Sequence, residues 1–232
     1  MNFRSRLKLT LFFAIIMALQ SSAADVLYVF YPTVMRPAVL EDILKKACPT
    51  LEISVFGRYQ DFKAKVEADH PQGILTKPQV LSQLSGYLPK LTGIRKGKNS
   101  ERFVLISIDK PVNLASLDQK TIGVVDFLGR KGMDDFVKEI LHTSPKINRV
   151  TKIEDLIPLL TFTMADAVLL NESNVSYFKK TSNLNFVITE IPDATAGILI
   201  FANNNSNAVD KNECIEKLPE NVLVNLGIEQ WK

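Results

Sequence analysis

Residues 117–170 constrain the fold of this chain most, because two short apolar runs there bracket helical segments. The runs are 121–125 and 165–170, and the helical segments between them are 133–142 and 153–161. Short apolar strands that alternate with helices predict a parallel β-sheet covered by helices. Such sheets bind ligands at the carboxyl ends of their strands. The pattern therefore favours an α/β binding protein.

Residues 1–24 have the three parts of a secretory signal peptide. Basic residues occur at positions 4, 6 and 8, an apolar run covers 9–19, and small residues occupy 22–24. This pattern predicts cleavage before Asp25 and export to the periplasm. The alternative is an uncleaved membrane anchor, for which the apolar run is short against the ~20 residues that a spanning helix needs.

The charge balance changes once this leader is removed. The whole chain has 28 Lys+Arg and 25 Asp+Glu, and the leader holds three of the basic residues and none of the acidic ones. The remaining 25 basic and 25 acidic residues are scattered along the sequence. A near-neutral chain without a basic run argues against nucleic acid as a partner.

The sequence contains two cysteines, Cys48 and Cys214. In an exported protein a lone pair of cysteines is a candidate disulfide, and the alternative is two free thiols. A bridge would tie the first predicted helix to the last one and so join the two ends of the chain.

Residues that carry catalysis are scarce in this sequence. The two histidines, His70 and His142, stand near helix ends, and no spacing of His, Cys and carboxylates matches a metal site. Nucleophile and phosphate-loop motifs are missing as well. We therefore expect a protein that is not an enzyme and that needs no metal or cofactor.

The order of predicted elements suggests two lobes. Strands are predicted at 25–31, 51–56, 72–75, 102–108, 121–125, 165–170, 184–190 and 197–203, and helices at 36–47, 59–68, 80–87, 133–142, 153–161 and 211–226. With 102–108 and 197–203 as the two crossings between lobes, residues 25–112 and 193–232 form lobe 1. Residues 113–192 form lobe 2.

Four segments carry a resemblance to a known family. They are the Tyr31-Pro32-Thr33 turn, the helix start at 59–62, the run 114–124 (LASLDQKTIGV) and the strand at 164–168 (MADAV). Together they resemble the type II periplasmic binding proteins, most of all the phosphonate- and phosphate-type solute receptors of ABC importers. The resemblance implies a bilobal α/β fold with a two-strand hinge and a monomeric, periplasmic solute receptor.

The resemblance places the ligand at loops after the strands. The predicted ligand-binding residues are Tyr31, Thr33, Lys77, Asp126, Arg130, Lys131 and Asn171. The basic members suit an anion and Asp126 suits an ammonium group, so the solute is expected to be anionic or zwitterionic. Simpler roles stay open: Tyr31 as a packing residue, Asp126 as a turn or cap residue, and Arg130 and Lys131 as solvated charges.

Two functions are compatible with these features. The first is an exported solute-binding protein that delivers its solute to the permease of an ABC importer. The alternative is a binding-protein-like domain that acts as a sensory or partner module for a membrane sensor kinase or chemoreceptor. A fold by itself does not distinguish them.

Overall fold

The structure is a computed structural model and describes residues 25–204 and 213–232. The predicted signal peptide, residues 1–24, lies outside this range, as do residues 211–212 of the expected terminal helix. Among the described residues, no helix combines the length and the apolar character that a membrane crossing requires.

The described strands form two mixed sheets. The six-stranded sheet has the spatial order β11 (Gln230–Trp231), β4 (Tyr87–Ile94), β10 (Ile200–Asn204), β3 (Gly73–Thr76), β1 (Asp25–Phe30) and β2 (Leu51–Val55). The five-stranded sheet has the order β7 (Lys146–Val150), β6 (Thr121–Val125), β8 (Ala167–Asn171), β5 (Ser100–Ile108) and β9 (Phe186–Gly197). Strands β1, β2 and β3 are parallel, as are β6, β7 and β8, whereas β10 and β5 run antiparallel to their neighbours.

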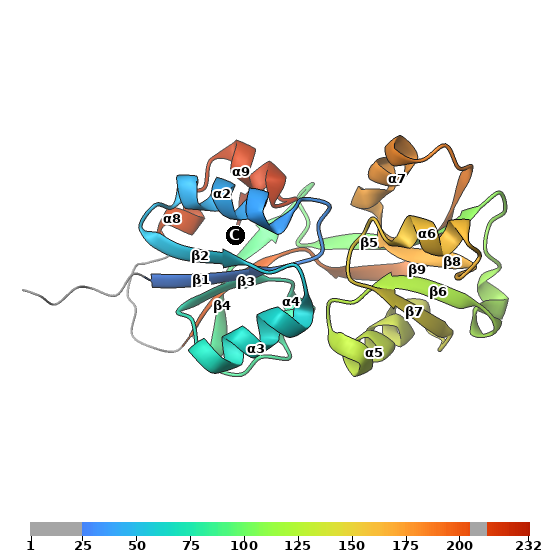
Figure 1. The fold of residues 1–232 in the computed structure, drawn as a ribbon, viewed down its shortest axis with the longest axis horizontal. Coiled ribbons are helices and arrows are strands. Elements are labelled where there is room, and N and C mark those ends of the chain that lie inside the picture. Colours follow the sequence, from blue (N-terminus) through green and yellow to red (C-terminus); the bar gives the residue numbers. More distant parts are fainter. Residues whose placement is uncertain (1–24, 205–212) are drawn as a thin grey trace, which may run out of the picture.

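Helices cover both faces of each sheet and give the bilobal fold shown in Figure 1. The first lobe contains α2 (Pro37–Ala47), α3 (Tyr59–Asp69), α4 (Pro78–Leu81), α8 (Glu213–Glu216) and α9 (Glu220–Asn225). The second lobe contains α5 (Gly129–Leu141), α6 (Leu156–Thr161), α7 (Val175–Thr181) and the 3-10 turns η1 (Leu114–Gln119) and η2 (Glu172–Asn174). Two chain segments, residues 95–99 and 198–199, connect the lobes; we call them the linkers.

Alternation of side chains along the strands separates the core into layers. Leu27 and Val29 of β1 pack with α2, α8 and α9, whereas Phe30 packs on the other face with α3. Leu105 of β5 belongs to the same cluster as Phe30, and its neighbour Ile106 packs with α6 and α7. One apolar cluster therefore continues from the first lobe into the second.

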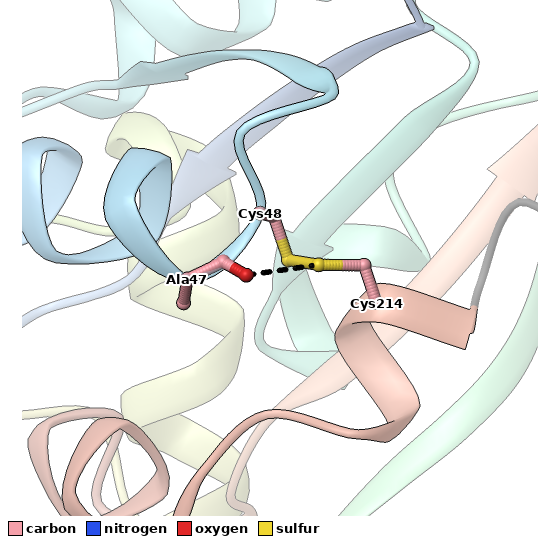
Figure 2. The surroundings of a disulfide bond; sticks show 3 residues. All are labelled: Ala47, Cys48 and Cys214. Carbon is pink, nitrogen blue, oxygen red and sulfur yellow. Dashed lines mark hydrogen bonds between the residues drawn. A yellow bond between two sulfur atoms is a disulfide. The ribbon is translucent and has the colours of Figure 1, made fainter.

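The disulfide predicted from the sequence is present between Cys48 and Cys214, whose Cα atoms are 5.8 Å apart (Figure 2). It joins the end of α2 to α8 across a separation of 166 residues. The Cys214 sulfur also lies 3.4 Å from the carbonyl oxygen of Ala47. Closing a loop of this length stabilises the folded chain by about 5 kcal/mol in the chain-entropy model.

Several predicted elements differ from those observed. The sequence predicts a crossing between lobes at 102–108, but β5 pairs with β8 and β9 along its length and lies in the second sheet. The chain therefore passes between the two sheets at the linkers, residues 95–99 and 198–199. The first linker ends where β5 begins, and the second begins where β9 ends. The strand predicted at 184–190 continues to Gly197 in β9, through a register shift in the β5–β9 pairing.

Helix boundaries differ where glycine or proline intervenes. The helix expected at 80–87 is only the four residues of α4; Gly86, at φ +85°, then leads into β4, which was not predicted. The terminal helix is divided into α8 and α9, because Pro219 caps the second and cannot continue the first. Strand β7 and helix α7 were also missed.

Candidate functional site

A cleft of about 580 Å³ lies between the two lobes. Its first-lobe wall comes from residues 30–33 after β1, 35–38 and 40 at the start of α2, and 55–57 after β2. Its second-lobe wall comes from residues 125–126 after β6 and 151–154 after β7. In both lobes the walls are thus the carboxyl ends of neighbouring parallel strands, which is where α/β sheets bind ligands.

Four charged residues of both signs line the cleft. Arg36 is contributed by the first lobe, and Asp126, Lys152 and Glu154 by the second. Within the described part of the chain, none of the four takes part in an ion pair with another side chain. A cavity lined by positive and negative side chains without ion-pair partners suits a small solute that itself carries both charges.

The first turn of α2 adds to the positive character of the first-lobe wall. Arg36 is the N-cap residue, and no side chain caps the helix there. Pro37 occupies the first helical position, and Ala38 follows it in the wall of the cleft. The amino end of a helix carries a partial positive charge. Arg36 and this helix end therefore make the first-lobe wall the side that attracts an anionic group.

Apolar side chains form the rest of the cleft wall. They are Phe30, Met35, Leu40, Val55, Phe56 and Ile153. Such surfaces accommodate the carbon skeleton of a solute, while a few polar groups orient it. The cleft therefore combines charged groups with a substantial apolar surface.

Tyr31 and Thr33, two of the predicted ligand-binding residues, line the cleft, and both are also held by the first lobe. The Tyr31 hydroxyl donates to the carbonyl oxygen of Asn225 at 3.2 Å, and burial raises the pKa of this phenol. The Thr33 Oγ1 accepts from the backbone N–H of Met35 at 3.2 Å. These contacts fix the loop after β1 in place at the cleft.

Asp126 lies in the cleft wall and also organises the turn into α5. Its Oδ1 accepts a hydrogen bond from the backbone N–H of Gly129 at 2.7 Å. Gly129 has φ +72°, and an added Cβ would meet the Tyr59 ring at 3.1 Å, so the turn favours glycine. Arg130 and Lys131 follow as residues of the first turn of α5, outside the cleft lining.

Lys77 and Asn171 are brought together, but in a different place from the cleft charges. The Lys77 ammonium lies 2.7 Å from Oε1 of Glu101, and Asn171 Nδ2 donates to Oε2 of Glu101 at 2.8 Å. Both Lys77 and Asn171 border a small apolar pocket that adjoins the cleft at Pro32 and Val125. Their polar atoms are engaged with Glu101, which distinguishes them from the uncompensated cleft charges.

Burial and hydrogen bonding act in opposite directions on the Glu101 carboxyl group. Burial raises its pKa, but the Lys77 charge and hydrogen bonds from Lys77, Asn171 and Ser173 outweigh burial and lower the pKa overall. Glu101 is therefore ionised at neutral pH. The pair with Lys77 is a buried ion pair.

Sequence reasoning did not identify Arg36, Lys152 or Glu154 as site residues. Arg36 stands at the start of the predicted first helix, and a cation at this position was the one feature of the sequence that could have indicated a site residue. Lys152 and Glu154 follow β7, which was not predicted, so nothing marked their loop as the end of a strand. All three lie in the cleft because parallel strands end beside it.

Comparison with known proteins gives a likeness in fold. No protein-family model and no curated protein matches the chain. The solved GluR0 ligand-binding core in complex with L-glutamate has a TM-score of 0.59 and 16% identity, over 89% of this chain and 97% of that one. Arginine-bound ArgBP from T. maritima has a TM-score of 0.54 and 14% identity, over 91% and 96%.

The same fold also occurs as part of a longer chain. The periplasmic domain of B. pertussis BvgS matches with a TM-score of 0.54 and 14% identity, over 91% of this chain and 43% of that one. These neighbours are domains of the type II periplasmic-binding-protein kind. The chain therefore has the bilobal type II periplasmic-binding-protein fold, as its sequence predicted.

Proposed function

We propose that this protein is an exported binding protein that captures a small zwitterionic or anionic solute between its lobes. The observation that carries the proposal is the cleft of about 580 Å³ with Arg36 on one wall and Asp126, Lys152 and Glu154 on the other. Arg36 and Lys152 are exposed, and none of the four has an ion-pair partner among the described residues, so their charges are accessible to a solute. A solute that bridges the two walls would compensate both signs at once.

The charge arrangement favours a zwitterion over a phosphonate or phosphate. A carboxylate or oxyanion would bind Arg36 and the amino end of α2. A simple oxyanion would leave Asp126 and Glu154 without a counter-charge, whereas an ammonium group on the same solute would pair with them. Two solved neighbours hold L-glutamate and arginine, which are both α-amino acids. We therefore rank α-amino acids ahead of the phosphonate-type solutes that the sequence resemblance suggests.

Binding to both walls provides the mechanism. A solute that contacts the two lobes together stabilises the conformation in which they are closest, and so shifts the population toward that form. In the proposed function, residues 1–24 direct export to the periplasm, and a monomeric closed form is presented to the permease of an ABC importer. No catalytic step is involved.

A sensory role is the second candidate. It is favoured by the likeness to the periplasmic domain of BvgS, where the matched fold is less than half of that chain. In this role the same cleft would bind a solute, and the closed form would contact a membrane sensor protein. Capture of the solute-loaded protein by purified permease, set against capture by a sensor domain, would separate the two roles.

A thermal-shift screen of residues 25–232 with the disulfide intact tests solute binding. The panel contains the proteinogenic amino acids, polyamines, small carboxylates, phosphate, methylphosphonate and sulfate. A solute present at about 100 times its Kd adds about 2.7 kcal/mol, which raises the Tm of a chain of this size by about 5–10 °C. A zwitterionic hit that is lost in Arg36→Met supports the proposal. A flat response to all α-amino acids contradicts the preferred solute class.

A further inference from the structure

A buried polar cluster lies where the two lobes join. Lys77 directly follows β3 of the first lobe, and Glu101 lies near the start of β5 in the second. Their side chains are only 6% and 10% exposed, and Nζ lies 2.7 Å from Oε1. This ion pair therefore connects the two lobes directly, through atoms that are shielded from solvent.

The remaining hydrogen bonds of Lys77 go to the chain as it leaves the second lobe. Its ammonium donates to the carbonyl oxygen of Gly197 at 3.2 Å and to that of Ile198 at 3.3 Å. With Glu101, these acceptors match the three N–H groups of a lysine. A side chain of the first lobe thus contacts both strands that lead to the linkers, β5 and β9.

The second carboxylate oxygen of Glu101 extends the cluster into the second lobe. It accepts from Asn171 Nδ2 at 2.8 Å and from Ser173 Oγ at 3.2 Å. Asn171 in turn accepts a hydrogen bond from Asn174 through its Oδ1. The carboxylate is therefore held in one orientation by groups at the end of β8.

The backbone around this cluster is tightly packed. Ile198 N–H donates to the Asn99 carbonyl at 3.1 Å, and Gly93 N–H to the Leu199 carbonyl at 2.9 Å, so the linkers are hydrogen-bonded to each other and to β4. A Cβ at Gly197 would lie 2.5 Å from Cγ of Pro78. Rotation of one lobe against the other must therefore displace the atoms that hold Lys77.

We infer that the Lys77–Glu101 pair is an interlobe lock, which stabilises the relative orientation of the lobes in this structure, and with it this shape of the cleft, over other orientations. Its members are positioning residues that act through the linkers. A buried ion pair gives little net stability compared with apolar residues of the same size, but it is directional, and removing one partner is costly. The inference concerns the lobes themselves and holds whether or not the cleft binds a solute.

Hydrogen exchange and small-angle scattering test the lock with the whole mature protein. Lys77→Met and Glu101→Gln each remove one charge and keep the side-chain size. For both variants we expect exchange in peptides covering 93–101 and 195–200 to be about tenfold faster than in the wild type. We also expect a larger maximum dimension in solution. Lys77→Met leaves a buried carboxylate unpaired, so the milder Glu101→Gln carries the same test if the first variant does not fold.

Asp134→Asn is the matched control. Asp134 pairs with Arg149 at 3.0 Å, and this ion pair joins α5 to β7 inside the second lobe. We expect its loss to leave exchange at the linkers and the solution dimensions unchanged. Faster linker exchange in Lys77→Met and Glu101→Gln but not in the control supports the lock. Wild-type linker exchange and dimensions in folded Glu101→Gln, or an equal increase in exchange throughout the chain, would overturn it.

Discussion

Two groups of charged residues lie at the boundary between the lobes, and they differ in how their charges are compensated. In the interlobe lock, Lys77 and Glu101 are buried, and the ammonium group of Lys77 has three hydrogen-bond acceptors for its three N–H groups. In the cleft, Arg36 and Lys152 are exposed and have no ion-pair partner among the described residues. The first arrangement holds the protein together, and the second is suited to binding something else.

The comparison shows that residue type and position at a strand end are not enough to assign a role. Lys77 and Arg36 are both cations beside the end of a parallel strand in the first lobe. What separates them is a carboxylate, Glu101, that the second lobe supplies to one and not to the other. The following substitutions test this difference, beginning with the largest expected effect.

The same substitution at Lys77 and at Arg36 should have very different effects on stability. Lys77→Met leaves the Glu101 carboxylate buried without its partner, which costs about 3–5 kcal/mol. Arg36→Met removes an exposed charge and should change the free energy of unfolding by less than about 0.5 kcal/mol. Urea unfolding of the two variants measures both values. Equal losses would show that the two cations are compensated alike.

The cleft substitutions should have little effect on stability but a large effect on solute affinity. For the amino acid with the largest thermal shift, Arg36→Met and Asp126→Asn should each raise the Kd about tenfold or more. The reason is that a charge-assisted hydrogen bond contributes roughly 1.5–3 kcal/mol. The Asp126→Asn side chain keeps an Oδ1 that can accept from the Gly129 N–H, so the turn into α5 is preserved. Calorimetric titration gives the Kd, and unchanged affinity in both variants would remove these residues from the site.

The pH dependence of stability should contain a contribution from the interlobe lock. Because the pKa of Glu101 is lower in the folded chain than its usual 4.5, its ionisation stabilises the fold above that value, and the stabilisation is lost as pH falls through the lower, folded pKa. The stability difference between the wild type and Glu101→Gln should therefore be constant from about pH 7 to about pH 5. Below this it should shrink, with a slope of at most about 1.4 kcal/mol per pH unit. Urea unfolding over a pH series from neutral to acidic measures it, and a difference that does not depend on pH would contradict the depressed pKa.

Arg130 and Lys131 should give the smallest effects. Neither residue lines the cleft, and neither takes part in an ion pair within the described ranges. Replacing either by Ala should change stability by less than about 0.5 kcal/mol and solute affinity by less than about twofold, because no contact to the cleft is lost. A tenfold loss of affinity would mean that the first turn of α5 reaches the solute when the lobes close.

The strands with continuous apolar runs, such as β1 and β6, could be predicted because they are buried on both faces. Tyr31, Thr33 and Asp126 were placed at strand ends on this basis, since each closely follows such a run, and all three line the cleft. β7 could not be found in this way: it is an edge strand whose sequence, KINRV, has only two separate apolar residues and no apolar run. With β7 missing, Lys152 and Glu154 had no predicted place at a sheet edge.

The role of Lys77 could not be predicted for a different reason. Its position after β3 was predicted correctly, but its partner Glu101 is 24 residues away and lies in another sheet. A single sequence shows where a charged residue stands along the chain and not which charge meets it. Glu101 also lies in the segment between the predicted helix at 80–87 and the predicted strand at 102–108, where no element was expected.

Binding of modified amino acids tests the central claim, that the cleft recognises both charges of a zwitterion, most directly. The amino acid with the largest thermal shift is compared by calorimetric titration with its carboxamide and with its N-acetyl derivative. We predict that each modification weakens binding about tenfold or more, and that Asp126→Asn reduces the penalty for the N-acetyl derivative. Equal affinity for the amino acid and its N-acetyl derivative, or tighter binding of phosphate or methylphosphonate than of any amino acid, would contradict the account.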